Sequence, residues 1–317
     1  MKIAKPKIAI SVGDINGVGI EIALKSHKEI SKICQPLYFI NSKLLARAAK
    51  ILNVYIPDNF EIYECGEDFE IKPGKVSKKS GKFSFISFEN ALNFTAKGRA
   101  DALVTLPINK ESWKKAKIPY KGHTDALSDY FNQNAIMMLG CDELYVALFS
   151  DHTPLKDVSK KIKFSKLKKF LLDFYASTKF DRVGVLGFNP HASDNGTIGG
   201  KEEIEIDMAI KAANATLSKE IFIGPLVADA AFTPNSLKST NRLIAMYHDV
   251  GLAPLKALYF DRSINVSLNL PIIRTSVDHG TAFDIAYQSR ASRQSYIESI
   301  KFAINSVKIQ GQKAKIN

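Results

Sequence analysis

Cysteine is scarce in this chain of 317 residues. Only three occur, and they lie far apart, at Cys34, Cys65 and Cys141. Because their number is odd and no two form a C-x-x-C pair, the sequence supports neither a disulfide framework nor a cysteine metal site. This usage is typical of a reducing compartment, so we expect a cytoplasmic protein.

Long apolar runs are absent as well. No stretch reaches the roughly 20 consecutive apolar residues that a helix needs to cross a bilayer, and residues 1–10 are too polar for a signal peptide. We therefore expect no membrane partner. Hydrophobic residues still make up 45% of the chain, which is enough for a globular interior. A chain of this length predicts two domains rather than one core.

Acidic residues are too few to balance the basic ones, and the formal net charge is +12. The densest basic segment is 156–169, where Ile162, Phe164 and Leu167 interrupt the lysines at helical spacing. Such spacing is typical of a solvated helix face over a buried one. Because no nucleic-acid-binding motif accompanies it, we expect no nucleic-acid partner, and a basic nucleic-acid-binding protein stays a distant alternative. A positive field would also concentrate anionic substrates.

Strand-like and helix-like segments alternate along the chain. Short apolar runs predict strands at 8–12, 36–40, 102–105, 143–149, 182–187 and 243–247, and helical patterns lie among them at 20–25, 43–52 and 204–217. This alternation favours an α/β fold with largely parallel sheets and helices on both faces. In such sheets ligands bind beyond the carboxyl ends of the strands, so we expect loops distant in sequence to converge there.

Two glycine-containing loops invite a comparison with nucleotide-binding loops. The first, 13–19, lies between a strand and a helix, but its spacing differs from G-x-G-x-x-G and no acidic residue ends a clear second strand. We therefore reject a Rossmann fingerprint. The second, 278–286, is predicted to enter a helix, where backbone N–H groups would receive a phosphate or an adenosine edge.

The chain has only six histidines. His27 lies in a helical stretch and is expected at the surface. The others stand in turn-like contexts, and three of them each follow a predicted strand: His152, His191 and His248. Three neutral imidazoles suit a divalent metal with positions left open, and the neighbouring Asp151 and Asp249 would orient two of the rings. Structural histidines are the alternative that this spacing leaves open.

A basic and polar set follows His248. Lys256 supplies a point charge, Arg274 a planar fork suited to phosphate or carboxylate, and Asn265 an amide beside them. Arg274 ends the apolar run 270–273, which is an unusual place for a charge that only faces water. Without further observations, surface charges with no shared target are the competing interpretation.

Taken together, six blocks of the sequence resemble the 4-hydroxythreonine-4-phosphate dehydrogenase family of pyridoxal phosphate biosynthesis: 11–21, 122–125, 151–157, 189–203, 246–256 and 270–286. They span nearly the whole chain. The resemblance implies two α/β/α domains with a cleft between them, as in isocitrate and isopropylmalate dehydrogenases. Residues 1–121 with 279–317 would form the first domain, and 122–278 the second, which would carry the metal and substrate sites. It also implies a homodimer whose active site is shared between subunits.

The resemblance further implies roles for individual residues. The metal ligands would be His152, His191 and His248, holding zinc, magnesium or cobalt. The substrate-binding residues would be His123, Thr124, Lys256, Asn265 and Arg274. The contacts to NAD or NADP would be His279, Gly280 and Asp284. The implied reaction oxidises 4-phosphohydroxy-L-threonine to a β-keto acid that loses carbon dioxide, with Asp249 and Lys256 as candidate bases.

The sequence departs from the family's usual pattern at several positions. The family usually has Pro-Ala at Ile15-Asn16, Pro at Ile20, Glu at Asp125, Gly-Glu at Ser193-Asp194 and Gln at Val250. None of these changes removes a proposed ligand. They leave room for a dehydrogenase of the same family acting on another phosphorylated or cyclic hydroxy acid. A three-histidine metallohydrolase is a more distant alternative.

Overall fold

A computed structural model describes residues 5–313, with side chains as far as residue 309. The described chain divides into two compact units. Unit 1 comprises the residues up to Gln133, Ile264–Val266 and those from Leu270 onward, and unit 2 comprises Asn134–Ser263 and Ser267–Asn269. None of the described helices is long and apolar enough to cross a membrane.

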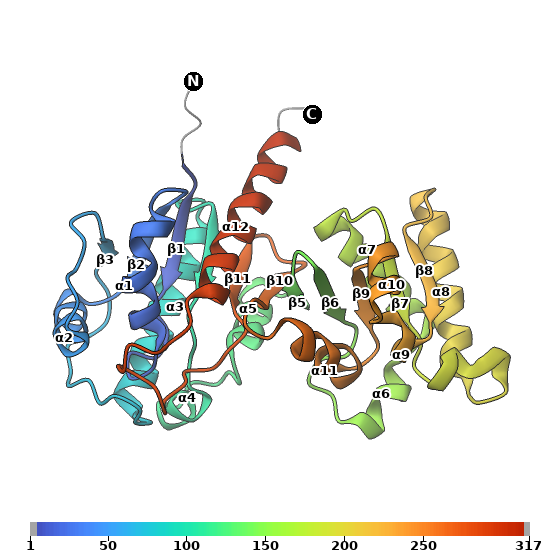
Figure 1. Cartoon of the computed structure of the whole chain (residues 1–317), viewed down its shortest axis with the longest axis horizontal. Coiled ribbons are helices and arrows are strands. Elements are labelled where there is room, and N and C mark those ends of the chain that lie inside the picture. The colour runs from blue at the N-terminus through green and yellow to red at the C-terminus, as the bar shows by residue number, and fades with distance from the viewer. Residues whose placement is uncertain (1–4, 314–317) are drawn as a thin grey trace. The chain divides into compact units, whose positions relative to one another are not determined.

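Unit 1 contains a parallel sheet in the strand order β3-β2-β1-β4-β11. These strands are β1 (Lys7–Ser11), β2 (Gln35–Phe39), β3 (Glu61–Tyr63), β4 (Ala102–Thr105) and β11 (Arg274–Val277). Neighbouring strands in this order pair in parallel, as the alternation predicted. Its helices are α1 (Gly19–Ile30), α2 (Ser42–Leu52), α3 (Lys78–Ala96), α4 (Lys110–Lys115), α5 (His123–Phe131) and α12 (Gln294–Lys313), visible around the sheet in Figure 1.

The side chains of the central strands alternate between two hydrophobic clusters. Ile8, Ile10 and Val104 belong to one cluster, together with residues of α1, α2 and α12. Ala9 and Leu103 belong to the other, together with residues of α3, α4 and α5. Because successive side chains of a strand point to opposite faces, the sheet of unit 1 is covered by helices on both faces, as the sequence predicted.

Helix α2 shows how local sequence sets the ends of these helices. The side chain of Asn41, at its N-cap, accepts hydrogen bonds from the backbone N–H groups of Lys43 and Leu44, and Asn53 ends the helix in the left-handed conformation. A cap of this kind contributes about 1 kcal/mol, and an asparagine pays less than most residues for the left-handed backbone at a helix end.

Unit 2 contains strands in the order β5-β6-β9-β7-β8. They are β5 (Ile136–Cys141), β6 (Leu144–Leu148), β7 (Val183–Leu186), β8 (Phe222–Leu226) and β9 (Arg242–Ala245). The last three pairings are parallel, but β5 and β6 form an antiparallel hairpin joined by Asp142 and Glu143. β10 (Ile264–Leu268) has residues in both units.

The helices of unit 2 are α6 (Leu155–Lys161), α7 (Phe164–Thr178), α8 (Lys201–Leu217), α9 (Ala228–Ala231), α10 (Pro234–Ser239) and α11 (His248–Tyr259), with the 3-10 segment η1 (Pro190–Gly196) (Figure 1). In α7, Leu167 and Leu171 are buried, whereas Lys166 and Lys169 are exposed. The basic segment is therefore an amphipathic helix in this region, as its spacing predicted.

The boundaries of the two units differ from those expected. Residues 122–133, 264–266 and 270–278 fall in unit 1, although the sequence analysis assigned 122–278 to the second domain. The reason is packing. Ala126 and Leu127 of α5 join the hydrophobic cluster of Phe88 and Trp113, and β11 pairs in parallel with β4. These contacts join segments that are far apart in sequence.

The expectation that His27 lies at the surface is wrong. Its ring is fully buried, with Nδ1 3.0 Å from the Tyr38 hydroxyl and Nε2 3.1 Å from Asn59 Oδ1. The rings of Tyr38 in β2 and of Phe60 pack against it, with centroids 5.7 and 4.9 Å away, so this side of α1 does not face water. Burial lowers the pKa of His27, and hydrogen bonding to Asn59, whose Oδ1 accepts from Nε2, opposes this effect.

Candidate functional site

The loops that follow β1, β4 and β11 meet in unit 1, as expected for parallel strands. The backbone N–H of Asp14 donates to the carbonyl of Pro107 over 2.9 Å, and that of Val18 donates to Thr281 over 3.1 Å. Gly13 has φ of 72°, and a Cβ there would lie 2.2 Å from the Pro107 oxygen, so only glycine fits this approach. The polar residues that follow these strands are thereby brought into one region.

Arg274 is the most deeply buried cation of this region. It begins β11, is only 2% exposed, and its Nη2 donates to Thr105 Oγ1 over 2.6 Å at the end of β4. Burial lowers its pKa to about 9, because removing a cation from water disfavours the charged form. Even so, the guanidinium is a cation at neutral pH. A buried positive charge of this kind is suited to an anionic group.

His123 stands beside Arg274 at the start of α5. Its ring packs 4.8 Å from the ring of Phe88 and 5.6 Å from that of Trp113, measured between centroids. Burial and, to a lesser degree, the charge of Arg274 hold the pKa of His123 well below its usual value. Its Nε2 atom is buried and has no hydrogen-bond partner among the described residues. The imidazole is therefore neutral and has a nitrogen available to a ligand.

The predicted substrate residues are divided between the units. His123, Thr124, Asn265 and Arg274 belong to unit 1, and Lys256, in α11, belongs to unit 2. The Oδ1 atom of Asn265, on β10, is buried and has no hydrogen-bond partner in the described part of the chain. Sequence reasoning missed Thr105 as the partner of Arg274. The position of Thr105 at the end of a predicted strand, before the turn at Leu106 and Pro107, could have indicated this role.

The predicted cofactor loop does not enter a helix, so that part of the prediction is wrong. Residues 278–293 hold turns but no helix, and α12 begins only at Gln294. Ala282, Tyr287 and Ser289 have φ of 42°, 62° and 62°, a conformation that interrupts a right-handed helix. The N–H groups of this loop are consequently not those of a helix start.

The loop still presents groups suited to a ligand. His279 Nδ1 donates to the carbonyl of Gly280 over 2.9 Å, which leaves Nε2 as an acceptor, and Nε2 is buried with no partner among the described residues. Burial lowers the pKa of His279. A Cβ at Gly280 would meet no atom within 4 Å, so open space lies there, and Asp284 is exposed.

In unit 2, two of the three predicted metal ligands lie close together. The ring centroids of His152 and His248 are 6.1 Å apart. His248 Nδ1 is 2.8 Å from Asp249 Oδ1, a hydrogen-bond distance, whereas His152 Nδ1 is 3.5 Å from Asp151 Oδ2. The hydrogen bond of His248 uses Nδ1, which leaves Nε2 of that ring available to a metal.

His191 does not complete this pair within one chain. It lies exposed in η1, a segment whose residues 191–195 all have positive φ. Among the residues that the structure describes, no group of three or more His, Cys, Asp or Glu side chains is placed to hold a metal ion. The donor types thus suit a divalent metal, but only two of the three imidazoles come together.

A pocket of about 400 Å³ lies next to His191 in unit 2. Its lining is mainly apolar and aromatic, with His191, Asn189 and Asp229 as the polar members. The loop at its rim is fastened by Glu203, whose Oε1 accepts from the N–H groups of Phe188 and Asn189 at 2.7 Å and whose Oε2 accepts from Asn189 Nδ2 at 2.6 Å. Sequence reasoning assigned Glu203 no role, because the three donors are 14 or 15 residues away.

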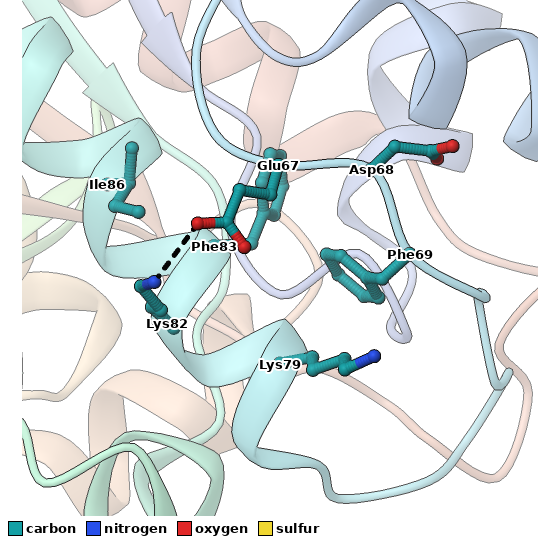
Figure 2. Close-up of a pocket in the computed structure, with 7 residues that line it drawn as sticks. All are labelled: Glu67, Asp68, Phe69, Lys79, Lys82, Phe83 and Ile86. Atoms are coloured by element: carbon teal, nitrogen blue, oxygen red, sulfur yellow. Dashed lines mark hydrogen bonds and ion pairs between the residues drawn. The ribbon is translucent and has the colours of Figure 1, made fainter.

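A smaller pocket in unit 1 has a volume of about 70 Å³. Phe69 and Phe83 line it, and Lys82 is paired with Glu67 at its edge over 3.3 Å (Figure 2). It contains no residue of the predicted sites, and its charges are exposed and largely balanced. We assign it no function.

Comparisons with known proteins agree with the resemblance. The family model described as pyridoxal phosphate biosynthetic protein PdxA matches residues 32–303. A 4-hydroxythreonine-4-phosphate dehydrogenase of Campylobacter fetus is 73% identical, with 94% of this chain and 97% of the relative covered. One of Sulfurimonas denitrificans is 60% identical, with 95% and 98% covered.

Solved structures confirm the expected fold class. The structure of a 4-hydroxythreonine-4-phosphate dehydrogenase from Klebsiella pneumoniae matches with a TM-score of 0.82 at 27% identity, covering 97% of this chain and 99% of the other. One from Burkholderia phymatum matches with a TM-score of 0.79 at 30% identity, covering 96% and 99%. The family model and the identity of the relatives show that the chain is an oxidoreductase and that it belongs to the pyridoxal phosphate biosynthetic protein PdxA family.

Proposed function

We propose that this chain catalyses the NAD- or NADP-linked, metal-dependent oxidation of 4-phosphohydroxy-L-threonine. The substrate's secondary alcohol loses a hydride to the nicotinamide and a proton to a base, which forms a β-keto acid. Loss of carbon dioxide, followed by protonation of the carbon that carried it, then gives 3-amino-2-oxopropyl phosphate. The names of relatives at 73% and 60% identity, aligned over nearly the whole chain, support the reaction. The description of the matching family model supports a role in pyridoxal 5′-phosphate biosynthesis.

The observation that carries the proposal is the buried cation of unit 1. Arg274 is 2% exposed, and the neighbouring His123 has an unpartnered Nε2 among the described residues. A buried planar cation beside a neutral imidazole is suited to bind an anionic group of a ligand. We propose that His123, Thr124, Asn265 and Arg274, with Lys256 of unit 2, bind the substrate, and that the guanidinium binds its phosphate.

The loop around His279 supports the use of a nicotinamide cofactor. The bound dinucleotide supplies the hydride acceptor. We propose that His279, Gly280 and Asp284 contact its adenosine half. Space is open at Gly280, and Nε2 of His279 has no hydrogen-bond partner among the described residues. Both features suit a ligand at this loop.

We propose His152, His191 and His248 as ligands of a divalent ion, which can be zinc, magnesium or cobalt. Such an ion, when bound, lowers the pKa of the substrate's hydroxyl. Asp249 already contacts His248 over 2.8 Å, which suits it to orient that ring. Lys256 lies two turns further along α11. We therefore favour Lys256 over Asp249 as the group that takes the hydroxyl's proton.

We further propose a homodimer in which each active site uses both subunits. Ile204 and Met208 lie one turn apart on α8 and are 64% and 50% exposed, and Ile198 nearby is 44% exposed. Exposed apolar side chains at such spacing are suited to burial against another protein surface. The incomplete histidine set of a single chain fits a site that a second copy completes. All three cysteines are free and buried, which suits the cytoplasm that we propose as its location.

Absorbance of NADH or NADPH tests the function directly. Purified protein is mixed with 4-phosphohydroxy-L-threonine, NAD or NADP, and zinc, magnesium or cobalt, before and after chelation. We expect nucleotide reduction that chelation removes and metal restores. Reduction with a phosphorylated hydroxy acid lacking the amino group, but none with 4-phosphohydroxy-L-threonine, would instead favour a same-family enzyme of different substrate. Phosphate release without any nucleotide reduction would favour a metallohydrolase.

A further inference from the structure

The glycine-containing loop after β1 is an internal support rather than a ligand-binding loop. Residues 12–24, which include Gly13, Gly17 and Gly19, are all buried. Because it is buried, this loop affects a ligand through the segments that pack against it. These segments include the turn at Pro107, the turn 72–75 and the cofactor loop, by which we mean residues 278–287.

Asn16 connects this support to the turn 72–75. Its side chain is fully buried, with Oδ1 accepting from the N–H of Lys72 over 2.9 Å and Nδ2 donating to the carbonyl of Lys75 over 2.7 Å. Its own carbonyl accepts from the N–H of Gly74 over 2.8 Å. One asparagine thus holds both ends and the middle of the turn.

The turn itself is well defined by its sequence. The N–H of Lys75 donates to the carbonyl of Lys72 over 3.1 Å, and Pro73 and Gly74 occupy the two central positions. Gly74 has φ of 68°, which a type II turn requires at its third residue. Proline at the second position and glycine at the third are the residues that this turn prefers.

Gly74 also contacts the cofactor loop. A Cβ at Gly74 would lie 2.5 Å from the carbonyl oxygen of Phe283, so the two backbones touch. Two residues earlier, the carbonyl of Thr281 accepts from the N–H of Val18, and a Cβ at Gly17 would lie 2.8 Å from that same oxygen. Ala282, with its positive φ, is therefore held from both sides.

These contacts account for how an irregular loop keeps one shape. Residues 278–293 have no helix to organise them, and left-handed residues cost free energy unless their surroundings hold them. Tyr287 adds a hydrogen bond of 2.7 Å from its hydroxyl to the carbonyl of Ile15. The contacts at Thr281 and Phe283 lie between the two exposed residues of the loop, Gly280 and Asp284, and next to them.

We propose that Asn16 is a positioning residue for cofactor affinity: through the Pro73–Gly74 turn it holds the cofactor loop in the shape that binds the adenosine half of NAD or NADP. This inference rests on the proposed function, because that function locates the cofactor at His279, Gly280 and Asp284. It assigns a role to a departure from the family pattern that lies away from Arg274 and His123.

The first test removes the side-chain hydrogen bonds of Asn16 and measures nucleotide binding without turnover. In Asn16→Ala we expect the dissociation constants of NAD and NADP, from calorimetric titration, to rise about tenfold, since two hydrogen bonds are lost. Trypsin should also cleave the Lys75–Val76 bond faster than in the wild type, because the carbonyl of Lys75 is no longer held. Asn41→Ala is the control: it removes a comparable set of side-chain hydrogen bonds at α2 and should leave both dissociation constants unchanged.

The second test disturbs the contact from the other side. Gly74→Ala places a methyl group against the Phe283 carbonyl and should weaken nucleotide binding about as much as Asn16→Ala. Gly98 is a matched control, since it has the same φ of 68° but nothing within 4 Å of a Cβ. Gly98→Ala carries the same backbone strain and should leave binding unchanged. Gly74→Ala and its control Gly98→Ala test the inference even if Asn16→Ala fails to fold.

The outcomes separate this inference from the proposed function. If wild type binds NAD or NADP, and both Asn16→Ala and Gly74→Ala bind it equally well, the positioning role is wrong and the function stands. If wild type binds neither nucleotide in the presence of metal, the proposed cofactor use fails, and the positioning role fails with it. Weaker binding in Gly74→Ala, with unchanged binding in Gly98→Ala, supports the inference.

Discussion

At the scale of single residues, the proposed substrate site of unit 1 is defined by a buried cation next to a buried imidazole. Arg274 and His123 lie in the interior of unit 1, where burial and, to a lesser degree, the charge of Arg274 lower the pKa of His123. Two cationic groups side by side would repel, so the imidazole stays neutral beside the guanidinium. A buried guanidinium beside a neutral imidazole is suited to bind an anionic group.

Replacing Arg274 with Ala should raise KM for the phosphorylated substrate chiefly, with kcat/KM falling about 100-fold, because a charge-assisted hydrogen bond in a buried site is lost. Arg274→Lys keeps the charge but not the planar fork, and should recover only part of this loss. Steady-state kinetics with the phosphorylated substrate and an unphosphorylated analogue provide the measurement. An equal loss on both substrates would argue against the phosphate role.

His27 should make the protein less stable in mild acid. Its pKa is lowered in the folded state, so the unfolded chain takes up a proton first as the pH falls below the ordinary histidine pKa of about 6.5. Stability is therefore full above that pH and declines below it. The decline amounts to at most about 1.4 kcal/mol per unit of pKa difference.

Urea unfolding between pH 5 and 8 measures this effect. His123 and His279 have pKa values lowered in the same direction, so wild type should show their combined slope. His27→Gln, which does not titrate in this range, should show a smaller slope. An identical slope in the variant would mean that His27 does not contribute.

At the scale of elements, the segments that precede helices matter as much as the helices themselves. Glu203, near the start of α8, accepts three hydrogen bonds from the segment that leads into His191. A buried carboxylate with three donors is acceptor-only by necessity. It fixes the exit of β7, and thereby the start of the loop that carries the third proposed metal ligand.

Replacing Glu203 with Gln should destabilise unit 2 and weaken metal retention. Either orientation of the new amide places N–H groups against N–H donors, and an unsatisfied buried donor costs about 1–3 kcal/mol. Thermal unfolding and metal analysis after dialysis provide the two readouts. Glu220→Gln, at an exposed position, serves as the control and should match wild type. Full stability in Glu203→Gln would contradict the role of these three hydrogen bonds.

At the scale of the whole molecule, the proposed dimer makes a quantitative prediction. His191→Ala and Arg274→Ala should each be nearly inactive alone. If one subunit supplies His191 and the other supplies Arg274, unfolding and refolding an equal mixture should restore about a quarter of wild-type activity, because half of the dimers are mixed and each mixed dimer has one intact site.

No recovery in the mixture would mean that each site takes both residues from one chain. Light scattering supplies a separate check on the assembly itself. Met208→Lys places a charge on the apolar face of α8 and should shift the wild-type dimer toward monomer, whereas the same change at an exposed polar position of α7, Ser177→Lys, should not. A wild-type protein that is monomeric throughout would overturn the dimer proposal.

Much of the fold was determined by local pattern. Short apolar runs between turn residues predicted the strands, and alternation with helices predicted parallel sheets, because both depend on contacts a few residues apart. The histidines after strands were recognisable for the same reason. The antiparallel β5–β6 hairpin was missed, since its two-residue connection lies between runs that look like other strands.

Only the tertiary structure decided the burial of His27, the helix-free cofactor loop and the membership of α5 and β11 in unit 1. Each depends on partners that are distant in sequence: Asn59 for His27, Gly17 and Gly74 for the loop, and β4 for β11. Local composition is similar in a helix that faces water and in one covered on two sides. The sequence by itself thus determined which residue types gather at the strand ends, and packing between remote segments decided which of them are buried together.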